Sequence, residues 1–249
     1  MLSENEKNQS LYYDKVAKVY DEHHSHPISI MYRKEFAYKY LFDSINMNQY
    51  YCLDAMCGGG EWSEYMLGRG AKVVGLDVSD ECCKIYKQRF SDCEVHNRSI
   101  IDSGFPDNTF DLVATDSLHH VQPNVENAID EIYRILKPGG YFIFWEPYEG
   151  SIFDIFRKIW YRKDVYFEKN EKSIDLKNLK EKNKNRFSFE LEKYGGNIAY
   201  LTIVTSMILR IPPSLKKYYY RPVFFIEKLF SSIQTKRTSV YVLGRWKKN

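Results

Sequence analysis

Two acidic residues beside a glycine-rich turn are the residues of this sequence best placed to hold a small ligand. An apolar run ends in Asp54 and continues as Ala55-Met56-Cys57-Gly58-Gly59-Gly60, which predicts a strand, a tight turn and the start of a helix. Such a turn gathers backbone N–H groups at the edge of a sheet. A second apolar run, residues 71–76, ends in Asp77, and an acid there can accept hydrogen bonds from both hydroxyls of a ribose. The pair predicts a site for a nucleoside-type cofactor.

The charges around this turn argue against a cofactor that carries phosphate. Gly58 and Gly60 match part of a dinucleotide fingerprint, but Ser63 stands where its third glycine belongs. Asp54 before the turn and Glu61 after it place two carboxylates where a pyrophosphate would lie. S-adenosylmethionine has an ammonium, a sulfonium and no phosphate, so electrostatics favour it over NAD.

Strands and helices alternate around these residues, which predicts a mostly parallel, doubly wound α/β sheet. We expect strands at residues 50–54, 71–76, 93–97, 110–115 and 141–145. We expect helices at 61–68, 80–90 and 123–136, the last beginning at Pro123. Outside this core we expect one or two helices in 11–42 broken near Pro27, helical structure without strands in 151–193, a sixth strand at 197–206, a helical stretch at 213–233 and a seventh strand at 239–246.

Composition indicates a globular protein with a substantial core. The chain has 249 residues, of which 44% are hydrophobic, enough for one large α/β domain with a lid or for two small domains. The five cysteines have neither zinc-ligand spacing nor the pattern of a disulfide framework, so we expect reduced thiols and a cytoplasmic location. Residues 1–10 lack the apolar core of a signal peptide, and the apolar run 199–209 is too short to span a bilayer.

Charge is divided unevenly along the chain. Residues 1–150 carry 14 Lys and Arg against 24 Asp and Glu, a net −10, whereas residues 151–249 carry 22 against 9, a net +13. The imbalance is either a chance property of solvated helix faces or the mark of a basic flank that receives an anionic substrate or a phosphate-bearing surface.

Several motifs together resemble the class I S-adenosylmethionine-dependent methyltransferases, in particular the ubiquinone–menaquinone-type small-molecule methyltransferases. Motif I of that family resembles Leu53-Asp54-Ala55-Met56-Cys57-Gly58-Gly59-Gly60. Order and spacing match over about residues 50–146. The other matching segments are residues 74–79, 105–113, 118–121 and 131–140, together with the lead-in Tyr13-Asp14-x-x-Ala17-x-x-Tyr20-Asp21.

The resemblance implies one methyltransferase domain over residues 1–249. Its Rossmann-like doubly wound sheet would have seven strands in the order 3-2-1-4-5-7-6, the last one antiparallel. We expect it to divide into an N-terminal helical lid at 1–45, a cofactor-binding core at 50–146, a substrate-side helical insert with the sixth strand at 147–235 and the last strand at 239–247.

The resemblance also implies which residues hold S-adenosylmethionine, whose product is S-adenosyl-L-homocysteine. The methionine end would meet Gly58 and Gly60, and the ribose hydroxyls would meet Asp77. Ser99 and Ile100 would flank the adenine, and Asp116 and Ser117 would lie under the sulfonium. The other residues expected to bind the cofactor are Asp54, Ala55, Met56, Cys57 and Val78.

Three positions leave alternatives open. Tyr20 either covers the cofactor, where its ring attracts the sulfonium, or belongs to the core. Arg33 either binds the cofactor carboxylate or is a surface charge. The family usually has an aspartate in place of Ser99 to accept the adenine amino group, so either the serine accepts that bond alone or Asp102 substitutes.

His119 and His120 follow the fourth expected strand, at the edge where such sheets bind ligands. A hydroxyl acceptor must lose its proton during methyl transfer, so one of them, with His119 preferred, is our candidate base. The alternative is that both are structural. Asp116 with the two histidines could also ligate a divalent ion, but the middle acid of the related metal-binding pattern is a histidine here, so we expect no metal. We expect His23, His24 and His26 to lie in a solvated loop.

The insert should shape the acceptor pocket and is aromatic and basic. The residues that suggest this are Trp160, Tyr161, Arg162, Lys163, Tyr166, Phe167 and the run from Lys216 to Arg221. Aromatic rings stack on sugars or planar rings, and Lys and Arg recognise phosphates. We therefore expect O- or N-methylation of an anionic small molecule or glycan, such as a nucleotide-linked or lipid-linked sugar. The alternatives are an RNA methyltransferase and a non-catalytic protein that only binds the cofactor.

The aromatic stretch at 213–233 allows two placements. It could lie on a membrane surface with Phe224, Phe225, Leu229 and Phe230 turned toward the lipid. Packing of the same residues against the sheet is the simpler expectation.

Overall fold

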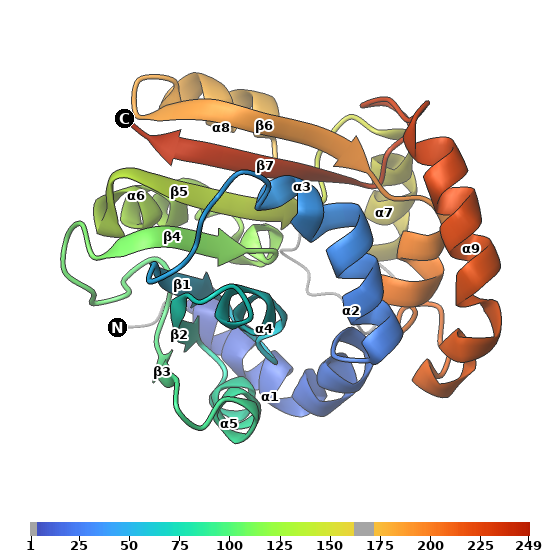
Figure 1. Ribbon diagram of the computed structural model, residues 1–249, viewed down its shortest axis with the longest axis horizontal. Helices are drawn as coiled ribbons and strands as arrows, with labels where there is room; N and C mark the ends of the chain where they lie inside the picture. The colour runs from blue at the N-terminus through green and yellow to red at the C-terminus, as the bar shows by residue number, and fades with distance from the viewer. Residues whose placement is uncertain (1–3, 162–171) are drawn as a thin grey trace.

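The computed structural model describes residues 4–161 and 172–249 and contains a seven-stranded sheet with helices on both faces (Figure 1). The strands are β1 Tyr51–Ala55, β2 Lys72–Asp77, β3 Glu94–Asn97, β4 Phe110–Thr115, β5 Leu136–Glu146, β6 Phe187–Gly195 and β7 Tyr241–Lys248. Their order is β3-β2-β1-β4-β5-β7-β6, and β7 is antiparallel to both of its neighbours. The predicted fold class, strand order and orientation of the last strand are therefore confirmed.

The two faces of the sheet are buried in separate cores because successive strand residues point in opposite directions. On β4, Leu112 packs with the core that contains Trp62 of helix α4, whereas Val113 packs with the core that contains Ile132 of α6. The first core lies under α2, α4 and α9, the second under α6 and α8. Helices α4 Glu61–Leu67, α5 Asp80–Arg89 and α6 Val125–Ile135 follow β1, β2 and β4, and helices α7 Ile152–Tyr161 and α8 Leu176–Asn183 lie between β5 and β6.

The N-terminal segment is helical and breaks near Pro27 as predicted. Helix α1 covers Glu4–His24, α2 covers Pro27–Arg33, a π-helical turn covers Lys34–Tyr38 and α3 covers Lys39–Leu41. The side chain of His26 caps α2 by accepting a hydrogen bond from the Ile28 N–H at 3.2 Å. Helix α1 packs against α5 and against the short turn that follows β4, which brings it across the carboxyl edge of the sheet.

The sixth strand was predicted in the wrong place. Residues 197–206 form no strand: the apolar side chains of Ala199, Ile203 and Val204 are buried at helical spacing, and Tyr200–Val204 is a π-helical turn. The true β6 lies within and just beyond a segment that we expected to lack strands. It is an edge strand whose charged residues alternate with partly buried ones, so its charges concealed the pattern.

Two other boundaries differ from the expectation. Helix α6 begins at Val125, because Asn124 has non-helical dihedrals and serves as the N-cap residue, so Pro123 precedes the helix.

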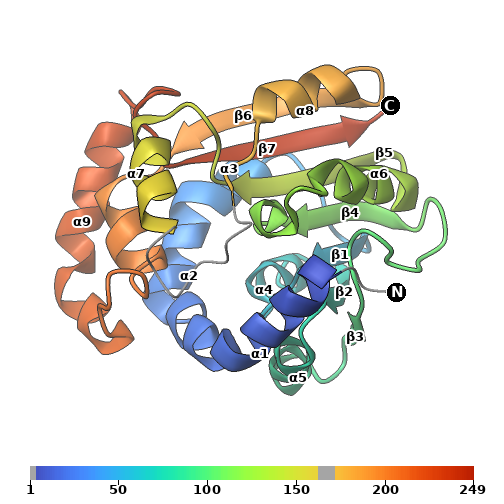
Figure 2. The same ribbon diagram turned by 180° about the vertical axis from the view of Figure 1, so that it is seen from behind.

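Helix α9 covers Lys216–Ser231 and lies at the same end of the molecule as α7 (Figures 1 and 2). On α9, Phe224 is buried, but Phe225, Leu229 and Phe230 are exposed, so the expectation that all four pack against the sheet is wrong. Within the part of the chain that the structure describes, no helix is long and apolar enough to cross a membrane.

Candidate active site

A cavity of about 790 Å³ opens at the carboxyl ends of β1, β2, β4 and β5, beneath α1. A cavity of this volume can hold a nucleoside cofactor together with a second small molecule. Most of the predicted site residues line it, namely Tyr20, Arg33, Met56, Cys57, Gly58, Asp77, Val78, Ser99, Ile100, Asp116, Ser117, His119 and His120. The structure therefore brings together residues from six separate stretches of the chain. Asp54, Ala55 and Gly60 do not line it.

The glycines of the turn have different structural roles. Gly58 has φ +49°, and a Cβ placed on it would meet no atom within 4 Å, so its missing side chain leaves room on the cavity side. Gly60 has φ +86°, and a Cβ there would lie 2.4 Å from the ring of Phe90. Gly60 is thus needed for the turn to pack beside Phe90 and beside Tyr86 of α5, and it does not line the cavity.

Asp54 lies behind the cavity wall, where it has a structural role. It is completely buried, and its Oδ2 accepts hydrogen bonds from the Ser63 N–H at 2.9 Å and the Ser63 hydroxyl at 2.7 Å. Burial raises the pKa of Asp54 well above its ordinary value. The serine that replaces the third glycine is therefore the partner that ties β1 to the first turn of α4, and the predicted ligand contact of Asp54 is not present in the cavity lining.

Asp77 ends β2 with its carboxylate in the cavity wall. Its Oδ2 accepts a hydrogen bond from the Gly58 N–H and its Oδ1 from the Ser79 N–H, each at 2.9 Å. Each carboxylate oxygen has a second lone pair, so the group can still accept two hydroxyl donors. The backbone bonds fix the carboxylate in one orientation before any ligand arrives.

The N-terminal helix is fastened over this region by two acids of the lead-in motif. Asp14 of α1 accepts a hydrogen bond from the Ser79 hydroxyl at 2.6 Å. Asp21 pairs with Arg89 of α5 at 2.5 Å, and Arg89 also donates to the carbonyl of Gly59. These contacts explain the spacing of the motif: its acids hold α1 against the two loops that carry the ligand-facing groups.

Ser99 meets a carboxylate that sequence reasoning missed. Its hydroxyl is hydrogen-bonded to Glu6 of α1, and both residues are buried in the cavity wall. Asp102, the predicted substitute, is exposed and does not line the cavity. Glu6 could not be recognised from sequence, because an acid in the first turn of a helix is ordinarily explained by the helix dipole.

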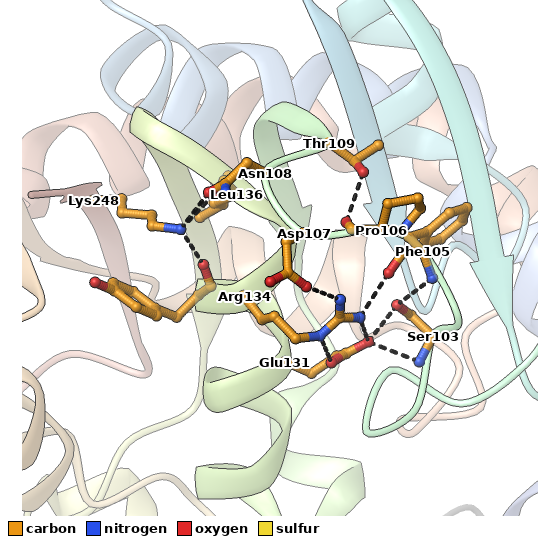
Figure 3. Close-up of polar contacts among 11 residues, drawn as sticks. Ser103, Phe105, Pro106, Asp107, Asn108, Thr109, Glu131, Arg134, Leu136 and Lys248 are labelled. Atoms are coloured by element: carbon orange, nitrogen blue, oxygen red, sulfur yellow. Dashed lines mark hydrogen bonds and ion pairs between the residues drawn. The ribbon is translucent and has the colours of Figure 1, made fainter.

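The loop that carries Ser99 is held from its far end by a network of polar contacts (Figure 3). Glu131 of α6 accepts hydrogen bonds from the Ser103 N–H at 3.0 Å and from Arg134 Nε at 2.8 Å. Arg134 also pairs with Asp107 at 2.6 Å. Asp107, Glu131 and Arg134 belong to the matching segments 105–113 and 131–140. Those segments therefore stabilise the loop and do not line the cavity.

Arg33 is buried and faces the cavity, so the surface-charge alternative is wrong. One of its terminal nitrogens pairs with Asp116 at 2.7 Å, and the other lies 3.0 Å from His24 Nδ1. Its Nε is buried without a hydrogen-bond partner. Burial alone would raise the pKa of Asp116, but the neighbouring guanidinium holds it below the ordinary value. Burial, and then Arg33, lower the pKa of His24, so this imidazole is neutral.

The expected solvated histidine loop is also wrong. His23 is buried at the end of α1, where its ring nitrogen lies 2.9 Å from the Ser206 hydroxyl. His24 stacks on Tyr20 with ring centroids 5.6 Å apart, and both rings line the cavity. Tyr20 is therefore part of the wall over the candidate site.

His119 belongs to a dyad whose second member was not anticipated. The short 3-10 turn Leu118–Val121 follows β4, and His119 Nδ1 lies 2.8 Å from Glu146 Oε2 at the end of β5. Glu146 is completely buried and also accepts the N–H groups of Leu118 at 2.7 Å and His119 at 3.2 Å. Burial raises its pKa to about 8. The signal available in the sequence was an acid at the end of a fully apolar strand.

His120 contacts α1 instead. The hydroxyl of Tyr13 lies 3.0 Å from its Nε2, and the side chain of Gln9 donates to its carbonyl oxygen. The rings of His119 and His120 lie 3.8 Å apart. His119 thus has a buried carboxyl group that can orient it as a general base once Glu146 is ionised, above a pH of about 8, whereas His120 joins the turn to the N-terminal helix.

Asp116, His119 and His120 do not converge as ligands. Asp116 pairs with Arg33 and His119 contacts Glu146. Over residues 4–161 and 172–249, the structure shows no group of three His, Cys, Asp or Glu side chains arranged for a metal ion.

The dyad makes a testable prediction about stability. Glu146 has a pKa of about 8 in the folded protein against an ordinary value of 4.5, so the folded state binds more protons between these pH values. The free energy of unfolding should therefore fall as pH rises from about 4.5 to about 8, by at most about 1.4 kcal/mol per pH unit from this group. Urea unfolding of wild type and Glu146→Gln measures this. As pH rises through that window, the free energy of unfolding of the variant should increase relative to that of wild type, and above a pH of about 8 the difference between the two should stay constant. Parallel pH profiles would contradict the raised pKa.

The far half of the cavity is apolar. Apart from Thr205, the residues that line it are Trp145, Phe153, Phe156, Tyr200, Leu201, Val204, Met207, Ile208, Leu209 and Val240. Arg157 also lines this part of the cavity, and it donates to the Ser173 hydroxyl at 2.9 Å and the Val240 carbonyl at 2.8 Å. The residues from Lys216 to Arg221 lie on α9 and do not line the cavity. The remaining predicted acceptor residues, from Trp160 to Phe167, lie outside those whose side chains the structure describes.

Comparison with known proteins agrees with this geometry. Residues 53–144 match the family model described as a methyltransferase domain. Demethylmenaquinone methyltransferase from Listeria monocytogenes is 34% identical over 96 residues, which are 35% of this chain and 40% of the relative. The match thus spans well under two thirds of that relative.

Solved structures match over much more of the chain. An S-adenosylmethionine-dependent methyltransferase from Thermotoga maritima has a TM-score of 0.66 at 17% identity, covering 96% of this chain and 99% of that one. An N-methyltransferase from Bradyrhizobium japonicum, solved with S-adenosyl-L-homocysteine, has a TM-score of 0.57 at 12% identity, covering 90% and 88%. At these identities the likeness establishes the fold.

Proposed function

Because this chain belongs to the class I S-adenosylmethionine-dependent methyltransferases, whose cofactor is S-adenosylmethionine, we propose that it methylates a small molecule held in the apolar half of the cavity. The observation that carries the proposal is the continuity of the cavity. Asp77 and Gly58 line the same cavity as a set of aromatic and aliphatic side chains, and Asp116 and His119 line it too. A donor and an acceptor can therefore meet in one enclosed space.

The residues present fit the cofactor. The carboxylate of Asp77 has lone pairs left for the ribose hydroxyls, and Gly58 leaves open space for the methionine part. The buried, unpartnered Nε of Arg33 suits the cofactor carboxylate, which would remove the cost of leaving that donor unsatisfied.

The apolar wall favours a flat, lipophilic acceptor over a sugar. A sugar needs many polar partners in a closed pocket, and the acceptor half offers mainly rings and aliphatic side chains. The relatives named demethylmenaquinone methyltransferase support a ring compound of the quinol type. The basic residues of α9 are absent from the wall, and among the described residues of the acceptor half Arg157 is placed to meet an anionic group on the acceptor.

The chemistry asked of the protein is modest. When bound, the cofactor supplies an electrophilic methyl group on a sulfonium. His119 would take the proton of the acceptor, Glu146 would hold the imidazole through Nδ1, and the apolar walls would exclude water. Asp77, Gly58 and Arg33 would hold the cofactor, and its sulfur would keep the carbon–sulfur bonding pair when the methyl group leaves.

A turnover screen with isotope-labelled methyl donor tests the proposal. The acceptors would be a demethylated naphthoquinol, a sugar nucleotide and an RNA oligonucleotide. Label in the naphthoquinol is the expected result. Label in the sugar nucleotide or in RNA would contradict the acceptor class, and tight binding of S-adenosyl-L-homocysteine without any turnover would favour a non-catalytic role.

We also propose that Glu6 provides the carboxylate that the family usually has at position 99. Glu6 reaches Ser99 from α1 and is buried in the same wall, so it can accept a hydrogen bond from the adenine amino group. Wild type should bind S-adenosyl-L-homocysteine about 10-fold more tightly than the analogue with a 6-oxo group, because that analogue cannot donate. Glu6→Gln should lose this preference, since an amide can donate to the oxo group. Calorimetry on both ligands measures it.

Glu4→Gln is the matched control for Glu6→Gln, because Glu4 lies in the same helical turn but is exposed. The control should keep the wild-type preference. Unchanged discrimination in Glu6→Gln would remove Glu6 from the adenine site.

A further inference from the structure

The outward face of α9 carries large apolar side chains that the rest of the described chain leaves uncovered. Tyr218 is 73% exposed, Phe225 69% and Leu229 59%. Together with the exposed Pro222 they recur at the spacing of one helical stripe. Contiguous exposed apolar side chains of this size mark interaction sites, whereas scattered single ones do not.

Basic residues border this stripe, and no acid interrupts it. Lys217 and Arg221 are exposed along one flank of the stripe, and Lys228 lies on the same flank, where it pairs with Glu35 at 3.1 Å. The acid of the helix, Glu227, is only 1% exposed and accepts a hydrogen bond from the Tyr32 hydroxyl at 2.8 Å. The solvent-facing side of α9 is therefore made of apolar and cationic groups. We call the stripe and its basic flank the α9 surface.

The same character continues beyond the end of the helix. Ile233 is 68% exposed and is followed by the exposed Lys236 and Arg237. The carbonyl of Arg237 accepts a hydrogen bond from the N–H of Ile152 at 3.0 Å, so α7 begins beside this turn. Helix α7 exposes Ile152 and, at 62%, Ile155, and both helices lie at one end of the molecule (Figure 2).

We propose that the α9 surface binds an anionic lipid bilayer. Apolar side chains on one stripe of a helix enter the boundary between headgroups and acyl chains, and flanking Lys and Arg are attracted to anionic headgroups. The net +13 of residues 151–249 adds a field of the same sign. A binding site for RNA would use the cations but leave the aliphatic and aromatic stripe in water, so the lipid accounts for both features.

The mouth of the cavity supports the same orientation. Phe156 of α7 is 62% exposed and Leu209 is 38% exposed, and both line the cavity. The segment that contains Leu209 leads through Pro213–Leu215 into α9. If the proposed function holds, a lipophilic acceptor dissolved in the bilayer would enter at this apolar edge. Binding of the bilayer itself does not depend on the identity of the acceptor.

Vesicle sedimentation tests the inference with the intact protein. Wild type should pellet with vesicles that contain about one third phosphatidylglycerol, and much less with pure phosphatidylcholine or at high salt. Phe225→Glu/Leu229→Glu should lower the partition coefficient at least about 10-fold, because two inserted side chains are lost and two repelling charges are gained. Arg221→Glu should lower binding to the anionic vesicles and leave the weak binding to pure phosphatidylcholine unchanged.

Leu11→Glu is the matched control, since Leu11 is 60% exposed on α1; it should bind vesicles like wild type. Unchanged affinity for S-adenosyl-L-homocysteine shows that each variant is folded, and that measurement also separates failure of this inference from failure of the proposed function. The inference is overturned if wild type ignores anionic vesicles or if the α9 variant binds them normally. It is equally overturned if wild type ignores vesicles but binds RNA, or is a dimer that the α9 variant turns into a monomer.

Discussion

Replacing Asp77 with asparagine should weaken binding of S-adenosyl-L-homocysteine by about 10- to 150-fold. The carboxylate is held by the N–H groups of Gly58 and Ser79, so it presents two oriented, charged acceptors to the ribose. Asparagine keeps the shape but loses the charge and one acceptor, and its amide must face a backbone donor. Titration calorimetry with the demethylated cofactor measures the loss without any knowledge of the acceptor.

Two comparisons make this result specific to the ribose. Asp102→Asn changes an exposed aspartate outside the cavity and should leave affinity unchanged. An analogue of the ligand that lacks the 2′-hydroxyl should bind wild type more weakly, but it should bind Asp77→Asn about as well as the full ligand does. Equal discrimination in both proteins would show that Asp77 does not contact the ribose.

The cofactor half of the cavity could be predicted from the sequence because its signals are local. The turn after β1 and the acid that ends β2 are each encoded within a few residues, and the parallel sheet brings their strand ends to one edge. The strand order was predicted from the resemblance to the methyltransferase family, which itself depends on short, local motifs. Asp54 and Gly60 show the limit of this reasoning: they belong to the motif, but one ties β1 to α4 and the other packs against Phe90.

The residues that were missed act across long stretches of chain. Glu6 meets Ser99 only because Asp14 and Asp21 fasten α1 over the sheet edge. Glu146 meets His119 because β4 and β5 are neighbours in the sheet. Neither pairing leaves a pattern of spacing in the sequence, since tertiary packing alone determines which side chains meet.

The C-terminal half was the hardest to predict for a related reason. Strand β6 is an edge strand, so it needs no continuous apolar run, and its charged residues resemble a solvated helix. The buried run from Ala199 to Val204 has the composition of a strand but packs as a helical turn against the first core. Burial, not propensity, decides both segments.

Replacing His119 with glutamine should lower kcat by about 10²- to 10⁴-fold, the largest effect expected in the cavity. Glutamine can still contact Glu146 but cannot take a proton from the acceptor. Affinity for S-adenosyl-L-homocysteine should stay close to that of wild type, because the dyad lies beyond the groups assigned to the ribose and adenine. The measurement is single-turnover methyl transfer to the acceptor found in the screen, across a range of pH.

The pH profile separates a base from a structural histidine. If His119 takes the proton with Glu146 as its ionised partner, the wild-type rate falls as pH drops below about 8, where Glu146 becomes protonated, and His119→Gln loses that dependence along with its rate. His120→Gln is the matched control: His120 lies beside the other ring but contacts Tyr13 and Gln9 of α1, so its loss should loosen the lid and raise KM more than it lowers kcat. If instead His119→Gln turns over at the wild-type rate with the wild-type pH profile, the dyad is a structural clasp between β4 and β5, and the acceptor must arrive already deprotonated.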